Sequence, residues 1–97
     1  MDLSKKTEDF YQKLELQLQD TAHWPSEYLY KFIVPTDDKK IQNIQQLFNN
    51  LGAVINTNAS KKGTYTSVSI NVRMKNPKAV IAKYKEVGEQ IEGVISL

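Results

Sequence analysis

Residues 64–74 carry the pattern that most constrains how this 97-residue chain can fold. Side chains there alternate strictly: one set comprises Thr66, Val68, Ile70, Val72 and Met74, and the other comprises Tyr65, Ser67, Ser69, Asn71 and Arg73. A period of two is that of a β-strand with one buried and one uncovered face. The segment therefore predicts a sheet whose core lies on one side.

A second strand is predicted over residues 28–34, which are rich in aromatic and β-branched residues. Pro35 ends it, because proline cannot continue a sheet ladder. The members of its apolar face, which we expect to lie under helices, are Tyr28, Tyr30, Phe32 and Val34. The opposite face consists of Leu29, Lys31 and Ile33.

Helical periodicity predicts three helices, over residues 4–20, 38–51 and 77–87. N-capping oxygens are expected from Thr36-Asp37-Asp38 for the second helix and from Asn76 for the third. Gly52 fits the left-handed position after a helix end, and Gly88 is expected to stop the third helix. Two further strands are predicted over 53–60 and 91–97, and a hairpin tip at Lys61-Lys62-Gly63.

After the first helix, the order of elements is β-α-β-β-α-β, which predicts an α+β fold of the ferredoxin-like type. Right-handed crossovers then give an antiparallel sheet in the order 4-1-3-2, with two helices on one face. We expect residues 1–22 to form an N-terminal helical extension and residues 23–97 to form the ferredoxin-like, ACT-like domain.

Lys31 and Arg73 are expected to point from the central strands to the face without helices. One interpretation is an anion or phosphate site, since arginine offers a bidentate fork. A second is RNA binding, which we disfavour because Ser67, Ser69 and Asn71 offer no aromatic rings for stacking.

The third interpretation, which we favour, is that the first helix covers this face. Its apolar stripe, Phe10, Leu14 and Leu18, would lie over Leu29 and Ile33, and its acids would meet the basic side chains. Residues 1–38 carry a net charge of −4 and residues 39–97 one of +6. The two parts could dock on each other, although ordinary solvated faces are the preferred explanation.

The other candidate interaction residues are Trp24, Tyr28, Lys61, Lys62 and Tyr65. Trp24 is a partner anchor or, as we prefer, a plug at the end of the sheet beside Tyr28. Lys61 and Lys62 are either contacts for an acidic partner or a soluble hairpin tip, and Tyr65 is the one aromatic side chain on the exposed face of its strand.

Catalytic motifs are weak in this sequence. There is no cysteine, and the one histidine, His23, lies in a connecting loop. Asp37-Asp38 is better explained by helix capping than by acid–base chemistry. We therefore predict no enzyme activity, no cofactor and no metal site. No signal peptide or membrane-length apolar run is present, which predicts a cytoplasmic protein.

The segment Trp24-Pro25-Ser26-Glu27-Tyr28-Leu29-Tyr30-Lys31-Phe32-Ile33-Val34-Pro35 resembles the signature of the YbeD-like bacterial proteins, domain-of-unknown-function family 493. The resemblance implies a ferredoxin-like fold akin to ACT-type regulatory domains, in bacterial cytosolic proteins loosely linked to lipoate metabolism. ACT-type ligand sites use a glycine-containing turn after the first strand, and the turn here, Pro35-Thr36-Asp37-Asp38, contains no glycine.

The predicted function is therefore a non-enzymatic regulatory or binding module, linked by the resemblance to lipoate or amino-acid metabolism. Its partner would be a protein or small metabolite, with a homodimer as one arrangement. The alternative is nucleic-acid binding through the open sheet face and the basic hairpin.

Overall fold

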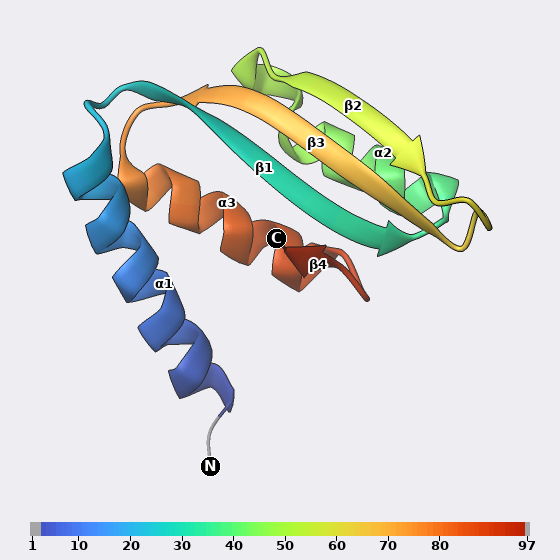
Figure 1. Ribbon diagram of the computed structural model, residues 1–97, viewed down its shortest axis with the longest axis horizontal. Coiled ribbons are helices and arrows are strands. Elements are labelled where there is room, and N and C mark those ends of the chain that lie inside the picture. The colour runs from blue at the N-terminus through green and yellow to red at the C-terminus, as the bar shows by residue number, and fades with distance from the viewer. Residues whose placement is uncertain (1–2, 97) are drawn as a thin grey trace.

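The computed structural model describes residues 3–96, and the side chains of residues 8–96. Within these residues the chain forms three α-helices, one short 3₁₀ turn and four strands (Figure 1). In chain order the elements are α1 (Leu3–Thr21), β1 (Ser26–Pro35), α2 (Asp38–Leu47), η1 (Asn49–Leu51), β2 (Val54–Ala59), β3 (Tyr65–Met74), α3 (Pro77–Gln90) and β4 (Ile95–Ser96).

The strands form one antiparallel sheet in the order β2-β3-β1-β4, which is the expected order read from the opposite edge. β1 and β3 pair over their whole length, from Ser26 opposite Met74 to Pro35 opposite Tyr65. β4 is much shorter than the strand expected over 91–97. Its paired residues lie opposite Phe32 and Ile33, and Leu97 lies outside the described residues.

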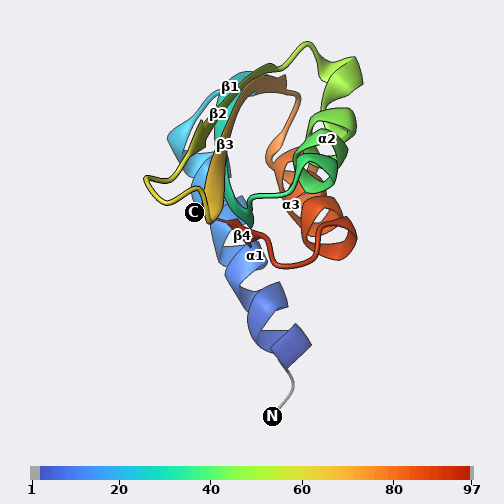
Figure 2. The same cartoon turned by 90° about the vertical axis from the view of Figure 1, so that its right-hand side faces the viewer.

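The two faces of the sheet differ as the alternation predicts. α2 and α3 lie on one face, whereas no helix of residues 3–96 lies over the other (Figure 2). The buried core lies between the sheet and the helices α2 and α3. It comprises Tyr30, Phe32, Val34, Ile44, Phe48, Val68, Ile70, Val72, Met74, Val80, Ile81, Tyr84, Val87 and Ile91. The expected inward faces of β1 and β3 are thus confirmed, although Tyr28 is half-buried.

Both predicted N-caps are confirmed. The Asp37 carboxylate accepts a hydrogen bond from the Lys39 backbone N–H at 2.9 Å. The Asn76 side chain accepts one from the Ala79 backbone N–H at 2.8 Å. Each satisfies a donor that the first turn of a helix cannot satisfy internally.

Gly52 has the expected left-handed backbone, with φ of 70°, but it follows η1 and not α2. The predicted last residues of α2 and α3 are wrong. α2 ends at Leu47, and the chain continues into η1 through Asn49 and Asn50, which are poor helix formers. α3 passes through Gly88 to Gln90, because the helix can absorb the small cost of one interior glycine. A left-handed backbone follows α3 at Gly93, with φ of 79°.

α1 does not cover the open sheet face, and this expectation is wrong. It packs along α3: the Tyr11 ring stacks on that of Tyr84, with centroids 6.2 Å apart. Lys85 and Glu8 form an ion pair at 3.0 Å, which joins the acidic and basic parts of the chain. In the short connection to β1, the Trp24 indole N–H donates to the Leu18 carbonyl at 2.9 Å, which ties the end of α1 to this connection.

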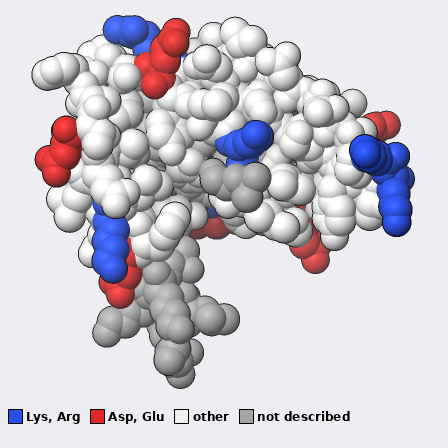
Figure 3. All heavy atoms as spheres, viewed as in Figure 1, with Lys and Arg blue, Asp and Glu red and all other residues white. Residues whose placement is uncertain are grey.

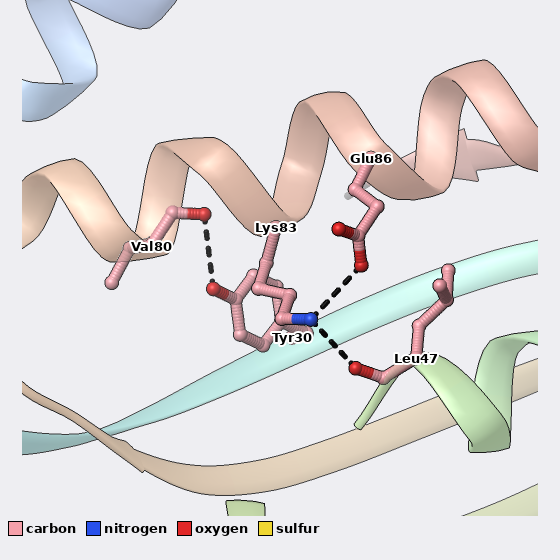
Figure 4. A network of polar contacts seen from close by, with 5 residues as sticks. All are labelled: Tyr30, Leu47, Val80, Lys83 and Glu86. Atoms are coloured by element: carbon pink, nitrogen blue, oxygen red, sulfur yellow. Dashed lines mark hydrogen bonds and ion pairs between the residues drawn. The ribbon is translucent and has the colours of Figure 1, made fainter. Parts of the chain in front are cut away.

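Polar contacts also fix the helices to each other and to β1 (Figure 4). The Lys83 ammonium donates to the Leu47 carbonyl at the end of α2, at 2.7 Å, and to the Glu86 carboxylate at 2.9 Å. The buried Tyr30 hydroxyl donates to the Val80 carbonyl at 3.0 Å. These bonds give the buried polar groups partners that they would otherwise lack.

Candidate functional site

The uncovered face of the sheet, here called the open face, is broad and carries few charges (Figure 3). Its exposed large apolar side chains come from all four strands: Leu29, Val54, Tyr65 and Ile95 are 59%, 63%, 47% and 51% exposed. Its middle is mostly polar, consisting of Ser67, Ser69 and Asn71 of β3 with Asn56 and Asn58 of β2 on one side of them. One charged side chain, the exposed Lys31 of β1, lies there opposite Ser69. A surface with this composition is well suited to contact another macromolecule.

The structure does not bring Lys31 and Arg73 together. Lys31 lies opposite Ser69, whereas Arg73 lies opposite Glu27, four residues further along β1. This separation corresponds to about 13 Å along the strands. The two residues do not form one anion site, and Glu27 places a carboxylate directly across from the arginine.

Lys61, Lys62 and Tyr65 lie at the other end of the sheet. The two lysines are exposed at the hairpin between β2 and β3. Tyr65 borders a shallow hollow of about 200 Å³ on the open face, lined also by Ile33, Asn58, Ala59, Ser60 and Ser67. The tyrosine ring and the apolar Ile33 side chain thus border one shallow depression.

Trp24 and Tyr28 do not belong to the open face. Trp24 is half-buried, packs against the core and donates its indole N–H to Leu18, as expected of a plug. Tyr28 lies on the helix side, where its hydroxyl and that of Tyr84 share a hydrogen bond 2.7 Å long. The seven predicted interaction residues therefore do not form one continuous surface.

A second feature, the aromatic cleft, was not predicted from the sequence. It is a hollow of about 190 Å³ lined by Phe10, Tyr11, Leu14, Tyr28, Tyr84 and Ser96. The residues come from α1, β1, α3 and β4, so no local pattern could have grouped them. Burial raises the pKa of the Tyr84 hydroxyl above its ordinary value, and its hydrogen bond to Tyr28 adds to this effect.

The residues considered for catalysis, among them His23, Ser26 and Asp37, are exposed or make other contacts. His23 is exposed, and the nearby Ser26 hydroxyl donates to the Glu27 carbonyl at 3.4 Å. Asp37 caps α2. Across the described part of the chain, no group of three or more His, Cys, Asp or Glu side chains is placed to hold a metal ion. None of the helices in residues 3–96 has the length and apolar character needed to cross a membrane.

Fold and surfaces together define an α+β domain with a four-stranded antiparallel sheet, helices on one face and an uncovered opposite face. Residues 19–95 match the family model described as "Protein of unknown function (DUF493)", and the chain belongs to this family. The resemblance seen around Trp24–Pro35 is thereby confirmed. No curated protein and no solved structure matches the chain significantly.

Proposed function

We propose that this domain is a non-enzymatic binding module that uses its open face to hold another protein. The observation that carries the proposal is the composition of that face, where four exposed apolar side chains surround serine and asparagine residues and one charge, Lys31. Depletion of charge and exposure of apolar area are features of protein-binding surfaces. The partner is either a second copy of the chain or a different protein.

We also infer that residues 23–97 belong to the ferredoxin-like fold and its ACT-like regulatory relatives, with α1 as an N-terminal extension. The β-α-β-β-α-β order and the strand order β2-β3-β1-β4 support this assignment. The family resemblance supports a regulatory role in a bacterial cytosol.

Two other uses of the open face fit the structure less well. A small-molecule site would be expected to enclose roughly 300–1,000 Å³, whereas the hollow beside Tyr65 measures about 200 Å³. Nucleic-acid binding would need clustered basic residues and aromatic stacking platforms. Here Lys31, Arg73 and the hairpin lysines lie apart, and Ser67, Ser69 and Asn71 occupy the middle of β3.

The proposal can be tested with a photo-crosslinking amino acid placed in turn at Leu29 and at Leu16 of the full chain in living bacterial cells. Leu29 is 59% exposed on the open face, and Leu16 is 60% exposed on α1, so the two sites match in residue type and accessibility. We expect discrete protein adducts from position 29 and not from position 16. Mass spectrometry distinguishes a second copy from another protein.

A Ser69→Arg substitution provides the complementary test. Ser69 lies at the middle of the open face opposite Lys31, and burying a second positive charge beside that lysine would oppose docking. We expect the adduct from position 29 to disappear. Equal adducts from positions 29 and 16, or an adduct with RNA in place of protein, would overturn the proposal.

A further inference from the structure

Part of one edge of β1 has no paired strand among the described residues. β3 pairs with all ten residues of β1, but the paired residues of β4 reach only Phe32 and Ile33 among the described residues. The β4 side of Ser26–Tyr30 therefore has no strand beside it within residues 3–96. An unpaired strand edge presents backbone N–H and C=O groups that can pair with another chain.

The usual protection of such an edge is weak here. Prolines, lysines, bulges and covering elements commonly block edge strands, yet Ser26–Tyr30 contains one charged residue, Glu27, and no proline. α1 lies nearby but is held by α3, through the Tyr11–Tyr84 stack and the Lys85–Glu8 ion pair. The aromatic cleft lies between α1 and this edge, because Phe10 and Leu14 form one wall and Tyr28 another.

We propose that the β1 edge and the aromatic cleft together bind an extended peptide segment, which adds a strand beside Ser26–Tyr30. This is a second binding surface, separate from the open face. Strand addition gains affinity from main-chain hydrogen bonds and specificity from pockets that take alternate side chains. The free edge of β2 lacks such a pocket, since its residues are exposed along almost its whole length.

The size of the cleft selects a peptide over a free small molecule. Its volume of about 190 Å³ is below the roughly 300–1,000 Å³ of small-molecule sites. It is enough for one large side chain of a segment whose backbone is held outside the cleft. The lining of three tyrosines, a phenylalanine and a leucine favours an aromatic or branched aliphatic side chain.

Strand geometry assigns positions along the bound segment. A residue directly opposite Tyr28 points to the same side of the sheet as Tyr28, and its side chain enters the cleft. The next residue lies opposite Leu29 and faces the open side, where Leu29 is 59% exposed. The preferred segment is therefore extended and neutral, with apolar side chains at these two consecutive positions.

The test is a selection from a library of random, displayed decapeptides on the full chain. Clones that also bind a Leu14→Trp variant, in which the larger ring fills the cleft, are removed. We expect the remaining peptides to share one aromatic or branched aliphatic position. On binding, the amides of Ser26–Tyr30 should become protected from hydrogen exchange.

Leu16→Trp is the matched control, because Leu16 is on the same helix and 60% exposed outside the cleft. It should bind the selected peptides like the unmodified chain. N-methylation of alternate peptide amides removes backbone donors and keeps the side chains. When the methylated amides are those that face β1, binding should weaken about tenfold or more. Phe10→Trp fills the cleft from an exposed position if Leu14→Trp unfolds. The proposal is overturned if no peptide is enriched, if cleft filling has no effect, or if N-methylation at neither set of alternate positions weakens binding.

Discussion

The hydroxyl groups of Tyr28 and Tyr84 lie 2.7 Å apart and join β1 to α3 through one hydrogen bond. The Tyr30 ring packs against both, with centroids 4.8 Å from that of Tyr28 and 4.9 Å from that of Tyr84. Tyr11 extends the cluster to α1. One group of aromatic rings therefore connects the sheet, the covering helix layer and the N-terminal helix.

The two buried tyrosines predict loss of stability in alkali. Burial raises the pKa of Tyr30 and Tyr84 above the ordinary 10.0. Above pH 10 the unfolded chain loses these protons while the folded chain keeps them, so the free energy of unfolding falls with pH. The slope is about 1.4 kcal/mol per pH unit for each tyrosine.

Denaturant unfolding across this pH range checks the prediction. Tyr30→Phe and Tyr84→Phe should each reduce the alkaline slope, whereas Tyr65→Phe, at an exposed position, should not. A free energy of unfolding that stays constant above pH 10 would contradict it. Tyr30→Phe should also lower stability at neutral pH by about 0.5–1.5 kcal/mol, because it removes the hydrogen bond to the Val80 carbonyl.

Tyr11 is predicted to anchor α1. Tyr11→Ala removes the ring stacked on Tyr84 and should lower the free energy of unfolding by about 1–2 kcal/mol. Phe10→Ala is the neighbouring control, since Phe10 is 62% exposed, and its effect should stay within about 0.5 kcal/mol. Nuclear magnetic resonance shifts caused by Tyr11→Ala should concentrate in α3, and large shifts at Leu29 or Ile33 would show that α1 reaches the open face.

Gly88 and Gly93 are predicted to respond oppositely to alanine. Gly88 lies inside α3, and an added Cβ would meet nothing within 4 Å, so Gly88→Ala should stabilise the fold by about 0.5–1 kcal/mol. Gly93 has φ of 79°, and its Cβ would lie 3.4 Å from the Pro35 side chain, so Gly93→Ala should destabilise the fold by about 1 kcal/mol or more. Thermal and denaturant unfolding measure both, and effects of the same sign would refute the assignment.

The adjacent acids at the start of α2 are predicted to have unequal roles. Asp37→Ala removes the cap to the Lys39 N–H and should cost about 1 kcal/mol of stability. Asp38→Ala removes a charge from the first turn and should cost about 0.3–1 kcal/mol, an effect that salt weakens. Asp37→Asn keeps a capping oxygen and should restore most of the loss. Equal losses for the two alanine variants at high salt would argue against the cap.

Local sequence patterns were sufficient for β1, β2 and β3 and for the starts of α2 and α3. Val68, Ile70 and Val72 alternate with polar residues, and Asp37 and Asn76 cap within their own turns, so neighbouring residues carry the information. The position of α1 could not be obtained in this way. Its apolar stripe requires burial somewhere, but the ring that fixes it to α3 is Tyr11, which lies beside the stripe at Phe10.

The candidate surfaces were predicted only in part. Alternation placed Lys31, Tyr65 and Arg73 on the open face, but not the four-residue separation between Lys31 and Arg73. The aromatic cleft is lined by residues as distant in sequence as Phe10 and Ser96, which the tertiary packing of α1 and the position of β4 bring to one hollow. Neither the packing of α1 nor the position of β4 can be recognised from a local sequence pattern.

The bond from Lys83 to the Leu47 carbonyl bears on the order in which the molecule assembles. α2 has ten residues, too few to persist alone in water, and its final turn receives this donor from a segment made thirty-six residues later. During synthesis, the end of α2 therefore lacks this hydrogen bond until Lys83 of α3 has been made. A fragment ending ahead of α3 should emerge from the ribosome as an unfinished intermediate that depends on its missing complement.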